Sequence, residues 1–424
     1  MTKSSHSSST AATRAPDFPM GFREFLALMA SLMALNALAI DAMLPAFPAI
    51  GNALGVAAAN DRQYILSAYL FGSAIGALFY GSLADRFGRK PVLLSAICAY
   101  AIFAALGGFS TSFTALLGFR FAQGLAAAAM GVVALAVIRD RFSGDRMARL
   151  VSLVFIVFMA VPIIAPTVGQ MILYVASWRY IFILFVVLSG VVGLWAWLRL
   201  PETLDPANVI PIRVDDVAAT WREVVTNRGA LGYVLASGVV MGGLFGYLNS
   251  AQQIFADIFD AADIFPYAFA AVAASIAISN WFNSRIVERF GARRVSHTAL
   301  IAFILLSGAQ IAAASLAHET LPIFLVLIAA NMSMIGFTGS NFGSIAMQPF
   351  GRMAGAASSF QQFARTLLAA GIGAVIGQLF DGSVVPMATG FLITGLVALV
   401  LVAWSERWEL FKRRMPPGTP AMPE

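Results

Sequence analysis

The sequence predicts an all-α integral membrane protein in which twelve transmembrane helices form two six-helix, pseudo-symmetric bundles. Three observations predict this fold. Of the 424 residues, 59% are hydrophobic and 11% are charged, which lies well outside the usage of soluble domains. Apolar stretches of about 18 to 25 residues, long enough to cross a hydrocarbon core of about 30 Å as helices, recur along almost the whole chain. A charged decapeptide, GSLADRFGRK at 81–90, also returns in altered form as SRIVERFGARR at 284–294.

The apolar stretches define the predicted helices in chain order. They lie at 22–50, 63–84, 91–109, 112–138, 150–174, 178–200, 229–256, 265–287, 295–316, 320–346, 356–380 and 386–405. The Ser/Thr-rich residues before them predict a mobile tail over 1–21. The first apolar stretch is too long for a secretory signal peptide and lacks a following cleavage signal, so we expect it to remain in the mature protein as helix one.

The basic residues predict the orientation. If the N-terminus lies inside, 23 of the 27 lysines and arginines fall in internal segments. The outer loops then hold only Arg62 and Arg179, and the spans hold Arg120 and Arg365. This asymmetry follows the positive-inside rule, so we expect a multi-pass protein with both termini in the cytoplasm. The net charge of +6 then reflects topology and does not indicate a nucleic-acid partner.

The repeated decapeptide divides the chain into two halves. It aligns Asp85 with Glu288 at an offset of 203 residues, and each copy follows the second helix of a six-helix set. Six crossings return the chain to its starting side, so two such halves face the same way, as parallel repeats do. We expect an N-terminal bundle over 22–200, a C-terminal bundle over 229–405 and a cytoplasmic tail over 406–424. The Pro-rich and charged stretch 201–228 predicts an internal linker with a short interfacial helix around Trp221.

The charges of the decapeptide predict a contact between the halves. Gly81 permits close approach of a neighbouring helix, and Gly88 permits a tight turn. Asp85 stands at the cytoplasmic surface, where the natural target for its charge is the positive N-terminal end of the helix that begins near 354–360. The charged loop then forms an intracellular clasp. The alternative is that its charges only set the topology.

Helix one carries an acid within the membrane. Counting from Phe25 at about 1.5 Å per residue places Asp41 roughly 24 Å along the helix, in its outer half and before Pro45 and Pro48. A bare carboxylate there is costly, so it must be protonated, paired or facing a watery cavity. Such a group can gain a proton in one conformation and lose it in another, which makes Asp41 the candidate proton-coupling residue. A static hydrogen-bonded acid near the helix end is the alternative.

Helix four carries Arg120, about 12 Å deep if Ser112 marks the outer end. A guanidinium keeps its charge, so it needs an anionic or carbonyl partner, and Asp41 is the obvious candidate. We expect Arg120 to serve coupling or substrate binding, with a structural hydrogen-bond hub as the alternative. Gln123, one turn on, should face the same side. Arg365, near the cytoplasmic start of helix eleven, could instead snorkel to the interface.

Helix five contains Pro162, Pro166 and Gly169. The prolines interrupt the hydrogen-bond ladder and the glycine permits close packing, which predicts a bend where the two halves meet. The alternative is an ordinary proline-kinked helix.

Four stretches together resemble the major facilitator superfamily. GSLADRFGRK looks like its signature loop between helices two and three, and LLGFRFAQG at 116–124 resembles its helix-four motif with a buried arginine. VPIIAPTVGQ at 161–170 resembles the helix-five antiporter motif, and DAMLP at 41–45 resembles the helix-one acid motif of drug/proton antiporters. With SWRYIF at 177–182 they look like the bicyclomycin/chloramphenicol resistance (Bcr/CflA) branch. The resemblance extends over the whole chain.

The resemblance adds residues to the predicted clasp. It implies that the acid of the signature loop latches the halves in the outward-facing state, together with a base matching Arg89 and an acid matching Asp140. Glu288 is the counterpart of Asp85 in the second copy. The resemblance also implies a bacterial inner-membrane location.

Two departures from the family pattern limit these implications. Met33 stands where some related multidrug antiporters have a second acid, which leaves the number of coupled protons open. Val161, Ala165 and Gln170 take glycine positions of the helix-five motif, so that motif supports antiport less firmly than an intact copy would.

The candidate substrate contacts are polar or aromatic residues well inside helices expected to line a cavity. They are Asn36, Tyr69, Gln123, Phe155, Phe158, Tyr247, Asn249, Gln252, Asn331, Asn341 and Gln361. Apolar walls with few polar groups are typical of small-ligand pockets. Because few charges are buried, the set favours an uncharged or lipophilic compound over a sugar phosphate or a nucleotide.

No cofactor is expected, and the proton is the predicted coupling ion. The three histidines lie in the tail or at loop edges and the single cysteine, Cys98, lies in an apolar run, so the sequence offers no cluster for a metal or a redox centre. The expected partners are a small-molecule substrate, protons and the lipid bilayer, with no nucleic acid. We expect the protein to be a monomer.

These features predict a proton-coupled antiporter, not an enzyme, that exports small amphipathic or uncharged compounds such as antibiotics. The first alternative is a proton symporter or uniporter for metabolite uptake, and the sign of the pH-driven flux separates the two. A non-transporting receptor or scaffold would show no flux. An intramembrane enzyme would need a nucleophile–base pair or a metal cluster that the sequence lacks.

Overall fold

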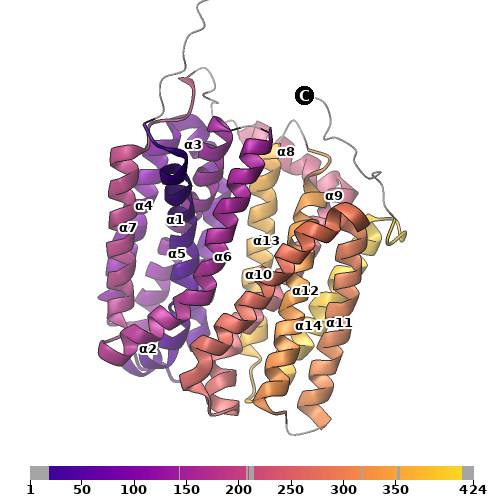
Figure 1. Ribbon diagram of the computed structural model, residues 1–424. Coiled ribbons are helices and arrows are strands. Elements are labelled where there is room, and N and C mark those ends of the chain that lie inside the picture. The colour runs from indigo at the N-terminus through magenta and orange to yellow at the C-terminus, as the bar shows by residue number, and fades with distance from the viewer. Residues whose placement is uncertain are drawn as a thin grey trace, which may run out of the picture.

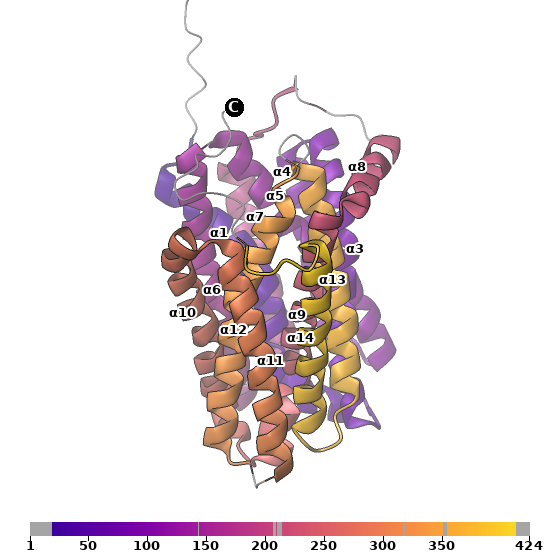
Figure 2. The ribbon, with the colours of Figure 1, turned by 90° about the vertical axis from the view of Figure 1, so that its right-hand side faces the viewer.

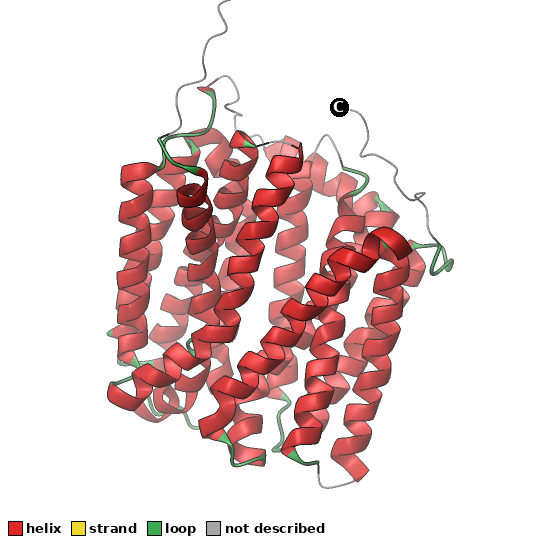
Figure 3. Cartoon of the chain, in the orientation of Figure 1, coloured by secondary structure: helices red, strands yellow, loops and turns green. Residues whose placement is uncertain are grey.

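The computed structural model describes residues 19–142, 144–206, 209, 214–316, 319–350 and 354–412. Among these residues every regular element is a helix (Figure 3), which confirms the predicted all-α class. The long helices are α1 (Phe22–Asp41), α3 (Tyr64–Phe87), α4 (Arg89–Gly108), α5 (Phe113–Arg141), α6 (Gly144–Val175), α7 (Arg179–Arg199), α9 (Arg228–Gln253), α10 (Phe265–Phe290), α11 (Ala292–Leu316), α12 (Leu321–Met347), α13 (Ala354–Gln378) and α14 (Val385–Ser405). Two shorter helices are α2 (Phe47–Ala53) and α8 (Val214–Thr226).

Eleven spans within the described residues are long and apolar enough to cross a membrane. The twelfth long helix, α13, lies outside that set because its first half carries Gln361, Gln362 and Arg365. It nevertheless packs between α3 and α9, so it is an integral part of the bundle. The sequence prediction of twelve bundle helices therefore holds.

The two halves of the chain lie side by side. In Figure 1, α1 to α7 form the left side and α9 to α14 the right side. The first and last described segments both lie at the upper end, which Figure 2 also shows, and we call this end the terminal face and the other the opposite face. The pairs α3–α13 and α6–α10 join the halves. The short helix α8 lies at the terminal face, where the ring of Trp221 stacks on that of Phe363 of α13 at 6.3 Å between centroids.

Both copies of the charged loop turn at a glycine with a positive φ angle. Gly88 between α3 and α4 has φ +97°, and Gly291 between α10 and α11 has φ +85°, values that favour glycine. A glutamate after the last helix of each half then bonds to the helix that follows the loop. Glu202 Oε1 accepts from the Arg89 backbone N–H at 2.9 Å, and Glu406 Oε1 accepts from Arg293 Nε at 2.6 Å.

Helix one differs from its prediction as a single helix over 22–50. It ends at Asp41, continues as a 3-10 turn over Leu44–Ala46 and resumes as α2. Pro45 and Pro48 explain the break, because neither can donate the backbone N–H that a continuous helix needs at its position.

Candidate functional site

Asp41 is the last residue of α1 and lies directly at this break. Its side chain is buried, with a residue exposure of 5%. Among the described residues none donates a hydrogen bond to its carboxylate, and no arginine, lysine or histidine forms an ion pair with it. The predicted acid within the membrane is therefore a buried carboxyl without a protein partner in this conformation.

Arg120 of α5 is fully buried and caps the same broken end of α1. Its NH2 group donates to the Ala39 carbonyl at 2.9 Å, and its Nε donates to the Ile65 carbonyl at 3.4 Å. Ala39 lies in the last turn of α1, where the final carbonyls have no donor within the helix. A cation at this end also complements the partial negative charge of the helix C-terminus.

The predicted ion pair between Arg120 and Asp41 does not form in this structure. Asp41 lies two residues beyond Ala39, which is roughly 200° around an α-helix at 3.6 residues per turn. The side chain of Asp41 therefore leaves α1 on a different side from Ala39, the residue whose carbonyl Arg120 contacts. Arg120 meets its need for acceptors with carbonyl groups and Gln123, so the hydrogen-bond hub that the sequence left as an alternative is what the geometry shows.

Three predicted polar residues join Arg120 in one network. Gln123 Oε1 accepts from Arg120 NH1 at 2.7 Å, and the guanidinium lies over the ring of Tyr69 at 4.4 Å from its centroid. The Tyr69 hydroxyl donates to Asn36 Oδ1 at 2.6 Å. Tyr100, which the sequence did not single out, donates to the Leu35 carbonyl at 3.4 Å. The network ties α1, α3, α4 and α5 together.

Close packing of α3 against α5 makes this network possible. A Cβ on Gly124 would overlap the Tyr69 carbonyl, and a Cβ on Gly72 would overlap the Phe121 carbonyl. The glycine that ends LLGFRFAQG is therefore needed for backbone contact, which brings Arg120 onto the Tyr69 ring.

Helix α6 packs on the break from the other side. A Cβ on Gly169 would overlap the Ala42 carbonyl and lie 3.1 Å from Pro45 Cγ, so only glycine fits. Helix α6 runs without interruption across Pro162 and Pro166. The helix-five motif thus places its glycine against the residue that follows Asp41, a contact the sequence did not predict.

The charged loop forms a compact cluster at the terminal face. Arg89 is 4% exposed and pairs with Asp85 at 2.5 Å and with Asp140 at 2.9 Å. These three predicted clasp residues are brought together by α3, α4 and α5. All three belong to the first half, so the described ion pairs brace that half internally.

Two residues that the sequence did not assign to the cluster complete it. Glu202 Oε2 accepts from the Lys90 backbone N–H at 3.1 Å, and a Cβ on Gly88 would lie 2.5 Å from the same oxygen. The Thr203 hydroxyl donates to Asp140 Oδ2 at 3.1 Å. The Pro-Glu-Thr stretch after α7 could have indicated this role, because a carboxylate near a helix N-terminus stabilises it.

The charged loop of the first half approaches α13 of the second half. A Cβ on Gly81 would lie 3.1 Å from Ser359 Oγ, so α3 approaches the first turns of α13 there. The predicted partner of Asp85 is the start of the helix near 354–360, and the side chains of 354–356 lie outside the described residues, so this latch stays a prediction. Glu288 lies exposed in the last turn of α10, in the second half, and its role also stays a prediction.

Of the predicted substrate contacts, two on α9 retain unused polar atoms. Asn249 is 1% exposed, and neither its amide nitrogen nor its amide oxygen has a hydrogen-bond partner among the described residues. The hydroxyl of buried Tyr247 also has no hydrogen-bond partner in the part of the chain that the structure describes, and its ring stacks on that of Phe269 with 6.0 Å between centroids. Buried polar groups are normally satisfied, so these atoms are the ones most suited to a ligand or a water.

Of the other predicted substrate contacts, some pack against neighbouring side chains and others are half-buried. Asn331 accepts from Ser307 at 3.3 Å, and Asn341 donates to Asn283 at 2.8 Å, so their amides hold helices of the second half together. Phe155 and Phe158 pack edge to face on α6 at 6.1 Å. Gln252 and Gln361 are half-buried, and so is Arg365, which the sequence analysis expected to reach toward the interface.

A set of side-chain amides joins the halves at the opposite face. Asn60 Nδ2 donates to the carbonyls of Gln378 at 3.1 Å and Phe380 at 2.8 Å. Gln253 Nε2 donates to Asn60 Oδ1 at 2.9 Å, and Gln63 Nε2 donates to Gln253 Oε1 at 2.6 Å. The sequence analysis missed these residues because amides at helix ends are common and carry no motif.

Comparisons with known proteins agree with this architecture. The family model described as Major Facilitator Superfamily matches residues 29–374. The chain is 27% identical over 381 residues to the "Bicyclomycin resistance protein homolog" of Haemophilus influenzae, covering 90% of this chain and 95% of that protein. It is 29% identical over 387 residues to "Multidrug resistance protein MdtL" of Klebsiella pneumoniae, covering 89% and 94%.

A solved structure shares the fold. The crystal structure of a D-xylose-proton symporter superposes with a TM-score of 0.72 at 14% identity, covering 92% of this chain and 99% of that one. The helical architecture, the repeated charged loop and the family match lead to one conclusion: the chain is a multi-pass membrane protein that belongs to the Major Facilitator Superfamily.

Proposed function

We propose that the chain is a proton-coupled antiporter of the bacterial inner membrane that exports small amphipathic or uncharged compounds such as antibiotics. The terminal face is then cytoplasmic, as the distribution of basic residues predicts. The names of the bicyclomycin and multidrug resistance relatives support export of such compounds. The substrate and protons would be its only diffusible partners, no cofactor takes part, and the monomer would be the working unit.

The observation that carries the proposal is the position of Asp41. It is a buried carboxyl with no hydrogen-bond or ion-pair partner among the described residues, and it lies at the break of α1, between a helix end capped by Arg120 and the Gly169 contact of α6. Proton binding at such a group depends on whether it faces water or apolar surroundings. When the halves rearrange, Asp41 would take a proton from outside and release it inside, in exchange for substrate moving outward.

Arg120 then has a supporting role in coupling. By holding the last carbonyls of α1, it fixes the backbone that presents Asp41. Tyr247 and Asn249 would offer the few polar contacts of an otherwise apolar substrate site.

The test is transport by purified protein in proteoliposomes, with bicyclomycin and chloramphenicol as probes. A pH gradient should drive probe movement against the direction of proton flow, and Asp41→Asn should remove that coupling. Asp257→Asn is the matched control, because it removes an exposed carboxylate at the opposite face. Probe movement in the same direction as protons would instead indicate uptake symport and would overturn the proposal.

A further inference from the structure

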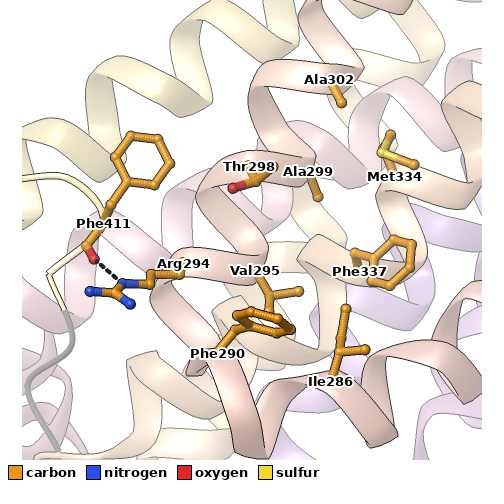
Figure 4. Close-up of a pocket in the computed structure, with 10 residues that line it drawn as sticks. All are labelled: Ile286, Phe290, Arg294, Val295, Thr298, Ala299, Ala302, Met334, Phe337 and Phe411. Atoms are coloured by element: carbon orange, nitrogen blue, oxygen red, sulfur yellow. Dashed lines mark hydrogen bonds between the residues drawn. The ribbon is translucent and has the colours of Figure 1, made fainter.

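A cavity of about 430 Å³ lies on the second half at the terminal face, outside the residues used above (Figure 4). Its walls come from the last turns of α10, the first turns of α11 and the middle of α12. Phe411, from the segment after α14, forms a further wall. We call this cavity the α11 groove.

The groove changes character along α11. Arg294, Thr298 and Ala302 line it at intervals of four residues, so they lie on one face of the helix. Arg294 and Thr298 are exposed. Beyond them the lining is apolar, with Met334 near Ala302 and Phe337 near Ile286 (Figure 4). The groove thus has a charged mouth and an apolar depth.

The mouth is held in shape by the chain segment after α14. Arg294 Nε donates to the Phe411 carbonyl at 3.0 Å, and the Phe411 backbone N–H donates to His297 Nδ1 at 3.1 Å. The Phe411 ring packs edge to face on the His297 ring at 5.6 Å. These contacts use one of the guanidinium nitrogens of Arg294. Within the described residues its two terminal nitrogens have no hydrogen-bond acceptor.

The surroundings define which molecule fits. Helix α11 packs on α12 and α14 and lies at the edge of the bundle away from the first half (Figure 1), so its outer side faces the bilayer. Arg289 lies at the same level, 5.3 Å from the Phe290 ring that lines the groove. Basic pockets between transmembrane helices at the membrane surface are suited to anionic lipid headgroups.

We propose that the α11 groove binds an anionic phospholipid of the leaflet at the terminal face. Its phosphate would accept hydrogen bonds from the terminal nitrogens of Arg294 and from the Thr298 hydroxyl. One acyl chain would lie along Ala302, Met334 and Phe337. This site is independent of the proposed transport function, since it shares no residue with the Asp41 region.

The test is native mass spectrometry of the purified protein in detergent with phosphatidylglycerol or phosphatidylcholine added. We expect phosphatidylglycerol to bind more tightly, and Arg294→Gln to weaken its binding about fivefold, the factor that about 1 kcal/mol per basic residue corresponds to. Arg285→Gln is the matched control, because Arg285 is a base on α10 that stacks on Trp281 outside the groove. It should retain the binding.

Ala302→Phe provides a second, charge-neutral variant that fills the apolar depth and should also weaken phosphatidylglycerol binding. Melting temperatures of all variants establish that they fold, and the arginine pair decides the question even if the Ala302 variant does not. Equal loss in the two arginine variants would show general attraction to surface charge and would overturn the proposal. Equal binding of the two lipids by the unaltered protein would overturn it as well.

Discussion

Arg120 satisfies acceptors on three helices, at the Ala39 and Ile65 carbonyls and at the Gln123 amide. It has no carboxylate partner among the described residues, and its guanidinium also rests on the Tyr69 ring. These contacts hold the helix segments around Asp41 in place, so the role of Arg120 in this structure is structural. We therefore expect replacement of Arg120 to affect stability and replacement of Asp41 to affect proton coupling.

Replacing Arg120 with methionine should therefore lower the free energy of unfolding by about 2 kcal/mol or more, because buried acceptors lose their donors. Thermal unfolding in detergent, followed by tryptophan fluorescence, measures the change. Arg285→Met, at an exposed position, should shift the melting temperature much less. Equal shifts in the two variants would show that Arg120 is not a hub.

Glu319, in the loop before α12, provides a pH-dependent test. Burial raises its pKa to about 7, although a hydrogen bond from Gln310 acts in the opposite direction. Because the folded protein holds this proton more tightly than the unfolded chain, stability should fall as pH rises from about 4.5 to about 7. Melting temperatures across this range should show a smaller slope for Glu319→Gln. An unchanged slope would mean that Glu319 does not titrate in this way.

At the scale of elements, the break of helix one and the glycine of α6 form one unit. The α6 backbone approaches the Ala42 carbonyl so closely that Gly169 cannot carry a side chain. The segment next to Asp41 is thus fixed by packing from α6 and by capping from α5. A change in the α6 contact should act on Asp41 without touching it.

We expect Gly169→Ala to separate α6 from the break and to destabilise the protein by about 1 to 3 kcal/mol, as overpacking does. Gly190→Ala on α7 is the matched control, because a Cβ there would meet no atom within 4 Å. Thermal unfolding and pH-driven transport of both variants give the comparison. If both behave alike, the packing account of the helix-five motif is wrong.

Much of the fold could be predicted because its signals are local. Apolar length indicated the helices, and the repeated loop indicated two similar halves with a glycine turn in each. The break after Asp41 was missed, since an apolar stretch that contains two prolines has the same composition whether the helix kinks or ends. The linker helix α8 does include Trp221, as predicted.

The candidate site was predicted less completely because it depends on which face of its helix each side chain occupies. Asp41 and Arg120 were both identified, yet their assumed pairing ignored the rotation between Ala39 and Asp41. Glu202 was not singled out, although its carboxylate accepts from the first backbone N–H groups of α4 from more than 110 residues away. Long-range contacts of this kind leave no trace in residue spacing.

At the scale of the molecule, the two ends of the bundle are held differently. The terminal face carries a charged cluster within the first half, and the opposite face carries hydrogen-bonded amides that connect the halves. Uncharged amides do not titrate, so this connection should be insensitive to pH. A Cβ on Gly377 would overlap Gln63 Oε1, which shows how closely α13 approaches the first half there.

Loss of the amide contacts should shift the protein toward a form open at the opposite face. Asn60→Ala removes three side-chain hydrogen bonds, whereas Asn52→Ala alters an exposed amide on α2 at the same face. Spin labels at Ala57 and Asp257, with Cys98 replaced by serine, would report the separation by electron double resonance. Only Asn60→Ala should populate longer distances between the two spin labels. Equal distance distributions in the two variants would show that these amides do not hold the opposite face closed.

The central claim is that proton coupling resides in the carboxyl of Asp41. The most direct measurement is proton release from detergent-solubilised protein on addition of bicyclomycin or chloramphenicol, followed with a pH-sensitive dye in weak buffer. The unaltered protein and Asp257→Asn should release protons on addition of the probe, and Asp41→Asn should still bind it but release none. Probe-induced proton release that persists in Asp41→Asn would contradict the account.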